Sequence, residues 1–111
     1  MPGDTPLERF ERLARQFAAT VDVTPGTGFG LNPGLRVDSH IFAMLVRDRL
    51  VVKLPKDRVD ELVASGSAVH FDTGKGRPMR EWAMVDPASD VEWDRVAIEA
   101  HAFVAGGSRG R

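Results

Sequence analysis

The chain has 111 residues, a length that suits one domain around one hydrophobic core, so we expect residues 1–111 to form a single domain. Hydrophobic residues make up 42% and charged residues 28%, with a formal net charge of −1, which is typical of a folded protein and gives no overall attraction to nucleic acid or anionic membranes. The chain has no cysteine, which excludes disulfides, thiolate metal ligands and thiol nucleophiles.

The first segment predicts an amphipathic helix. Thr5-Pro6-Leu7-Glu8 combines a capping hydroxyl, proline at the first helical position and a glutamate three residues after the cap. The expected apolar face consists of Leu7, Phe10, Ala14, Phe17 and Val21. The following stretch, TPGTGFGLNPG at 24–34, predicts a loop, with a short strand at 28–31 as an alternative. Its glycines do not indicate a dinucleotide site, because that motif lies between a strand and a following helix.

The middle of the chain predicts strands joined by tight turns. HIFAMLV at 40–46 is apolar on both faces, so we expect it inside the sheet, and Arg47-Asp48 predicts the turn into the next strand. Pro55 opens a short helix through Ser65, and Gly66 suits the left-handed residue that ends it. The predicted strands, in chain order, are 35–37, 40–46, 49–54, 69–71 and 80–85.

The last part of the chain predicts a strand and a helix. In GKGRPMREWAMV at 74–85, alternation places Arg80, Trp82 and Met84 on one face, and we expect Trp82 and Met84 to pack under a helix. Ser89 and Glu92 predict the cap of the final helix, and we expect a flexible tail at 105–111. The pattern predicts a two-layer α+β fold: an antiparallel sheet of about four to five strands with three helices mainly on one face.

A family resemblance follows from these segments. LRVDSHIFAMLVRDRLVVKLPKDRVDELVASG and the later GRPMREWAMV resemble the amino-terminal domain of the TfoX/Sxy proteins and the broader YjbR/MmcQ-like group, over roughly residues 28–104. The resemblance implies a stand-alone bacterial domain of that fold, with a core at about 5–104. Longer members are linked to regulation of natural competence through a second domain that these residues do not include. The resemblance therefore implies a regulatory or binding role without a defined biochemical activity.

The residues indicate no catalytic constellation. Asp38-Ser39-His40 holds all three residue types of a hydrolase triad, but neighbours in sequence point in different directions, whereas a triad is assembled from separate segments. The pairs Asp38/His40 and His70/Asp72 have a spacing that could supply four metal ligands, yet both lie at turn edges, where local hydrogen bonding explains them better. We expect no catalytic residue, cofactor or metal.

The charge pattern predicts a binding module. Two basic segments, 47–58 and 75–80, are interspersed with acidic residues. The candidate binding surface consists of Arg47, Arg49, Lys53, Lys75, Arg77 and Arg80. We expect contacts with a protein partner or self-association, with nucleic-acid binding through these basic segments as the alternative and a small hydrolase or metal-binding protein as less favoured. No segment has the ~20 apolar residues of a membrane span or a leader pattern, so we expect a cytoplasmic location.

Overall fold

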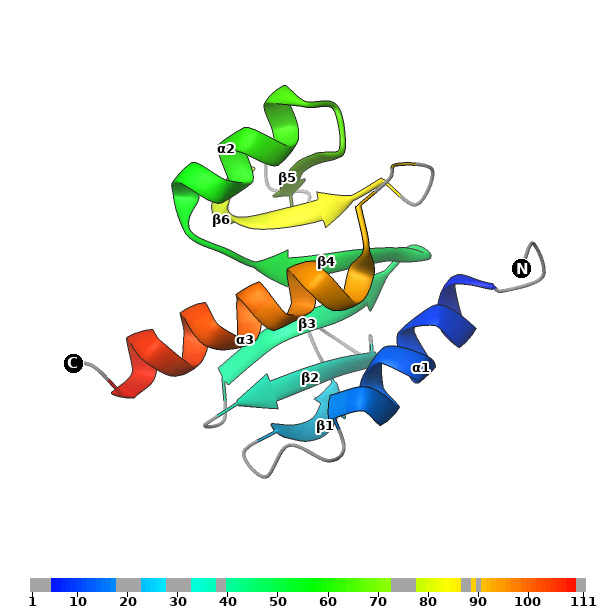
Figure 1. Cartoon of the computed structure of the whole chain (residues 1–111). Helices are drawn as coiled ribbons and strands as arrows, with labels where there is room; N and C mark the ends of the chain where they lie inside the picture. Colours follow the sequence, from blue (N-terminus) through cyan, green and yellow to red (C-terminus); the bar gives the residue numbers. More distant parts are fainter. Residues whose placement is uncertain are drawn as a thin grey trace.

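The computed structural model describes residues 5–17, 23–27, 33–37, 40–72, 78–86, 89 and 91–109. Within them the elements are α1 (Pro6–Phe17), β1 (Val23–Thr27), β2 (Pro33–Val37), β3 (His40–Val46), β4 (Arg49–Lys53), α2 (Lys56–Ala64), β5 (Ala68–Asp72), β6 (Pro78–Val85) and α3 (Trp93–Arg109). The strands form one antiparallel sheet in the order β1-β2-β3-β4-β6-β5, and the helices lie over one of its faces (Figure 1). The predicted two-layer α+β fold is confirmed, with six strands in the described residues rather than four to five.

The capping residues of α1 form the reciprocal pair that the sequence predicts. The Thr5 backbone N–H donates to Glu8 Oε1 at 2.9 Å, and the Glu8 backbone N–H donates to Thr5 Oγ1 at 3.1 Å. The buried face of the helix is Phe10, Leu13 and Phe17, whereas Leu7 is 46% exposed, so the expectation that Leu7 belongs to the core is wrong.

The additional strand is β1, in a stretch that we expected to be a loop. Val23 to Thr27 pairs with Val37 to Pro33 along β2, although the segment contains Pro25 and Gly26. A strand at the edge of a sheet tolerates both residues because only one side of its backbone must pair. The alternative strand at 28–31 lies outside the described residues.

The β3–β4 hairpin turns at Arg47 and Asp48, as predicted. Both residues have positive φ values, 51° and 66°, which two-residue hairpin turns of the I′ class require. Neither is glycine or asparagine, so the turn holds two side chains in a region that L-residues rarely adopt. Helix α2 follows at Lys56 and ends before Gly66, whose φ of +80° confirms the predicted left-handed stop.

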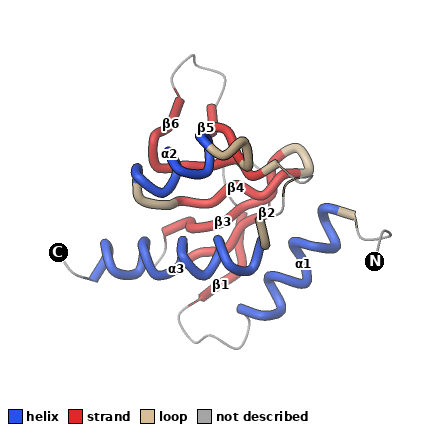
Figure 2. Tube along the Cα trace, turned by 45° about the horizontal axis from the view of Figure 1, so that its top comes forward, coloured by secondary structure: helices blue, strands red, loops and turns tan. Residues whose placement is uncertain are grey.

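The sheet is apolar on both faces, and this produces two separate clusters. The first contains side chains from all three helices and from the strands beneath them, including Phe42, Leu50 and Val85. The second contains side chains of strands only, and its buried members are Met44, Val46, Val51, Phe71, Trp82 and Met84. The face that carries this second cluster has no described helix on it, and we call it the helix-free face (Figure 2).

The position of Trp82 corrects a prediction. Trp82 and Met84 share a face, as alternation predicts, and Trp82 is only 7% exposed. They belong to the helix-free face, whereas Ala83 and Val85 pack under the helices, so the prediction that Trp82 and Met84 pack under a helix is wrong. Alternation separates the two faces of a strand, but both faces of β6 are apolar, so the pattern does not say which one the helices cover.

Helix α3 differs from its prediction at both ends. Ser89 does not cap it: the Ser89 hydroxyl donates to the Asp86 carbonyl at 2.7 Å, and the first helical hydrogen bond runs from the Val96 N–H to the Glu92 carbonyl at 3.2 Å. At the other end the helix continues to Arg109, so the described part of the segment predicted as a tail is helical. Ala105 is 7% exposed within the core, and this packing extends the helix beyond the expected end.

Candidate functional site

The helix-free face carries basic side chains beside its apolar cluster. Arg49 pairs with Val46 and Lys53 with Trp82 across neighbouring strands, and partners directly opposite each other in an antiparallel sheet share a face. Because Val46 and Trp82 belong to the second cluster, Arg49 and Lys53 lie on the helix-free face. Arg36 reaches the same face, since it pairs with Ile41, which packs against that cluster.

Lys53 and Trp82 contact each other on this face. The Lys53 Nζ lies 5.7 Å from the centroid of the Trp82 ring, a cation–π distance, and Lys53 itself is half-buried. The aliphatic stem of the lysine can therefore shield the tryptophan while its charge stays hydrated. At 7% exposure the Trp82 ring acts as a support for the lysine rather than as an exposed surface on which a ligand could stack.

The described charges on the helix-free face have one sign, whereas the helix layer carries both signs. On the helix-free face, the charged strand residues whose side chains are described are all cations: Arg36, Arg49 and Lys53. The exposed Arg47 lies at the hairpin turn between Val46 and Arg49, with Asp48 beside it. We call Arg47, Arg49 and Lys53, with the half-buried Arg36, the cationic row. Arg47 and Arg49 make no ion pair with other described residues.

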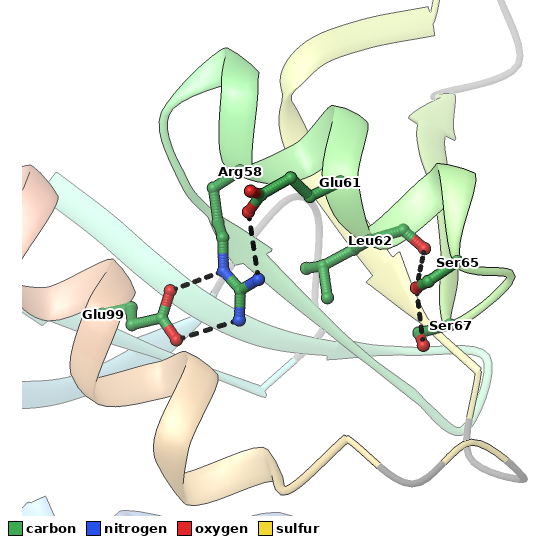
Figure 3. Close-up of polar contacts among 6 residues, drawn as sticks. All are labelled: Arg58, Glu61, Leu62, Ser65, Ser67 and Glu99. Carbon is green, nitrogen blue, oxygen red and sulfur yellow. Dashed lines mark hydrogen bonds and ion pairs between the residues drawn. The ribbon is translucent and has the colours of Figure 1, made fainter.

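Two cations of the predicted basic segment 47–58 lie in the other layer and are already paired. Arg58 on α2 holds Glu99 on α3 through Nε–Oε1 at 2.8 Å and Nη2–Oε2 at 3.2 Å, and its Nη1 contacts Glu61 at 3.2 Å (Figure 3). The hydrogen bond with Glu99 raises the pKa of Arg58 above its ordinary value. Lys56 pairs with Asp60 at 3.1 Å, and this hydrogen bond lowers the pKa of Asp60. The segment 47–58 is therefore divided between two surfaces.

The remaining predicted surface residues are only partly placed. Arg80 lies on β6, but its side chain is not among those described, and Lys75 and Arg77 lie outside the described residues. Arg36 was missed by the sequence reasoning, although its position between Leu35 and Val37, which are both buried, was a readable alternation signal.

The histidines do not form the metal site considered from the sequence. His40 begins β3 and His70 lies on β5, with β4 and β6 between them in the sheet. His70 Nε2 instead contacts Asp60 Oδ1 at 3.4 Å, and Asp38 lies outside the described residues. Among described residues, no group of three or more His, Cys, Asp or Glu side chains could hold a metal ion. His101 packs beside Phe17 and Phe42, with ring centroids 5.8 Å and 5.4 Å away.

A cleft of about 260 Å³ lies between α1 and the start of α3. Its lining residues are Arg9, Arg12, Leu13, Gln16, Glu92, Trp93 and Asp94. The Arg9 guanidinium stacks over the Trp93 ring at 4.0 Å. Among the residues that the structure describes, the lining contains no serine, threonine or histidine, so these residues supply neither the nucleophile nor the imidazole base of a hydrolytic site.

Comparisons with family models, curated proteins and solved structures find no match to this chain. The TfoX/Sxy resemblance therefore stays a prediction from the sequence. In the part of the chain that the structure describes, no helix combines the length and apolar character that a membrane crossing requires.

Proposed function

We propose that this chain is a non-catalytic, cytoplasmic binding module of the TfoX amino-terminal type that holds an acidic segment of a partner protein on its cationic row. The observation that carries the proposal is that the described charged strand residues on the helix-free face are all cations. Arg49 and Lys53 lie on a face whose described strand residues include no carboxylate, while the acidic residues of α2 and α3 lie in the other layer. A local positive surface on a chain with a net charge of −1 favours anionic partners at that surface alone.

Protein is favoured over nucleic acid as the anionic partner because of the burial of Trp82. Single-stranded nucleic acid binds to such sheet faces by stacking bases on exposed aromatic rings, and a ring that is 7% exposed offers little surface for stacking. Duplex recognition uses a helix or ribbon inserted into a groove, but the helices here are packed against the sheet by their apolar faces. A carboxylate-rich peptide needs only the cations and the backbone of an extended strand.

The expected affinity is modest. Exposed ion pairs contribute about 0.2 to 1 kcal/mol each, so the row alone supplies only a few kcal/mol and the interaction weakens as salt is added. The complex should therefore be transient, with its specificity completed by apolar contacts at the margin of the row.

The test compares two double variants that remove the same charge from opposite layers. Arg49→Ala/Lys53→Ala removes two cations from the row, and the matched control Lys56→Ala/Arg95→Ala removes two exposed cations from the helix layer. Fluorescence anisotropy with an oligoglutamate peptide at low salt measures affinity, and a single-stranded oligonucleotide of equal charge serves as competitor. We expect the first variant to bind the peptide at least about fivefold more weakly and the control to change less than about twofold.

Two results would contradict the proposal. Equal weakening in both double variants would mean that net charge rather than the row determines binding. If the oligonucleotide bound more tightly than the peptide, and Arg49→Ala/Lys53→Ala abolished that binding, the partner of the cationic row would be nucleic acid and not protein.

A further inference from the structure

We propose that β5 pairs antiparallel with β5 of a second copy of this chain, so that one sheet continues through two molecules. The sheet order β1-β2-β3-β4-β6-β5 leaves two edges, at β1 and at β5, and Figure 2 shows them at opposite ends of the sheet. The β5 edge is separate from the cationic row, and the proposal does not depend on the proposed function.

The two edges differ in how they are protected. β1 carries Pro25 and Gly26, residues that disfavour the addition of another strand. β5 has the sequence Ala68-Val-His-Phe-Asp72, with no proline, glycine or lysine, and with two residues of high strand preference at its centre. The β5 edge therefore lacks the proline, glycine and lysine that protect many edge strands, although the strand is short and its pairing with β6 shifts register between His70 and Phe71.

The hydrogen-bond pattern shows which backbone groups face this edge. The Asp86 N–H donates to the Ser67 carbonyl at 2.8 Å, and hydrogen-bonded pairs alternate with non-bonded pairs along an antiparallel ladder. With Ala68 opposite Val85 and His70 opposite Ala83, the backbone N–H and C=O groups of Ala68 and His70 point away from β6. They make no hydrogen bond to other described residues, so they are available to a neighbouring strand.

The hydrogen bonds between β6 and β4 support the same outward direction for the backbone of His70. The Leu54 N–H donates to the Glu81 carbonyl at 2.9 Å, which directs the backbone of Glu81 and of Ala83 toward β4. Met84, one residue further, then faces β5, where it pairs with Val69. The β4–β6 and β5–β6 pairings therefore both indicate that the backbone N–H and C=O of His70 point toward the open edge.

A two-fold axis at His70 makes the strand complementary to itself. In that register His70 faces His70 of the second copy through two reciprocal backbone hydrogen bonds, and Val69 faces Phe71 of the second copy. Val69 is 50% exposed, one of the few large hydrophobic side chains described as exposed, and Phe71 is 3% exposed. A β-branched residue opposite an aromatic one is a favourable cross-strand pair. The pairing therefore buries Val69 of each copy against Phe71 of the other copy.

The charge and size of the interface set the expected strength. A net charge of −1 gives little repulsion between copies. Strand β5 has only 5 residues, so the interface falls in the small, transient class and the dimer should form reversibly as concentration rises.

Sedimentation velocity from about 10 μM to about 1 mM, the range in which weak dimers form, tests the proposal on the wild-type chain and four variants. His70→Pro removes the outward N–H without breaking the β6 ladder, and His70→Ala is its matched control because it keeps that N–H. Val69→Lys places a charge on the edge, and Val69→Thr is the control for loss of the valine side chain.

We expect the wild type, His70→Ala and Val69→Thr to shift toward twice the mass of one chain as concentration rises. His70→Pro and Val69→Lys should remain monomeric, with dimer affinity reduced at least about tenfold. Circular dichroism checks that each variant folds. If His70→Pro does not fold, the test uses Val69→Lys and its control Val69→Thr.

Two outcomes would overturn the proposal: a wild type that stays monomeric throughout the range, or association that persists unchanged in Val69→Lys. Val69→Lys should bind oligoglutamate at least as tightly as the wild type, because it adds a cation to the helix-free face, whereas Arg49→Ala/Lys53→Ala should dimerise normally. Failure of the dimer can thus be distinguished from failure of the cationic row.

Discussion

Replacing Trp82 by alanine tests the assignment of the second apolar cluster. Trp82 is 7% exposed and packs among Met44, Val51 and Met84 on the face without a described helix. A buried tryptophan truncated to alanine costs about 3 to 5 kcal/mol, and the lost contact with Lys53 adds up to about 1 kcal/mol. Since domains of this size are stable by about 5 to 15 kcal/mol, the variant should retain only part of its stability.

Urea titration measures this loss directly. With a slope of about 1 to 3 kcal/mol per molar urea, the midpoint should fall by about 1 to 6 M. The chain has two tryptophans, so Trp93 alone reports fluorescence in the variant, and circular dichroism follows the same transition independently. Trp82→Phe is the control, because it keeps most of the ring and should lose less than half as much. An unchanged midpoint in Trp82→Ala would refute the reasoning, since the ring would then contribute nothing to the core.

Three further predictions concern the turn, the helix layer and pH. Arg47→Asn/Asp48→Gly should stabilise the chain by about 1 kcal/mol, because both native residues have positive φ; a lower melting temperature would contradict this. A double-mutant cycle on Arg58 and Glu99, both 35% exposed, should give a coupling energy of about 0.5 to 1 kcal/mol in urea titrations, and a value near zero would mean that the pair only coincides in space. The pKa of Asp60 is lower in the folded chain, so its contribution is complete above its unfolded pKa of about 3.9 and is lost as pH falls through the folded value. The wild type should therefore exceed Asp60→Asn in stability near neutral pH and lose that advantage in acid, and a constant difference in urea titrations across pH 7 to about 2 would contradict the linkage.

Local chemistry made much of the fold predictable. The capping box at Thr5, the turn at Arg47-Asp48 and the helix stop at Gly66 each depend on residues within a few positions of one another, and each is confirmed. The strand at Val23–Thr27 was missed because pairing with β2 outweighs the poor strand preference of proline and glycine. The choice of face for Trp82 depends on how three helices pack, which alternation along one strand does not contain.

The candidate surface was predicted less completely than the fold. Arg49 and Lys53 were identified as members of the basic segment 47–58, and the structure places both on the helix-free face. Lys56 and Arg58, only a few residues later, were grouped with them because spacing in sequence was the guide. The chain leaves the sheet at Pro55 and enters α2, so these two cations lie among acidic neighbours in the other layer.

The position of β6 inside the sheet has a consequence for synthesis of the chain. Of the described strands, β6 is the last to be made, yet it lies between β4 and β5 and pairs with both. Until Val85 has left the ribosome, β4 lacks a partner on one side and β5 has no partner strand, although the meander from β1 to β4 can already form from neighbouring segments. A nascent chain that stops before β6 therefore exposes the unpaired edge of β4 and the unpaired apolar strand β5, and premature termination there should yield an aggregation-prone fragment rather than a smaller stable domain.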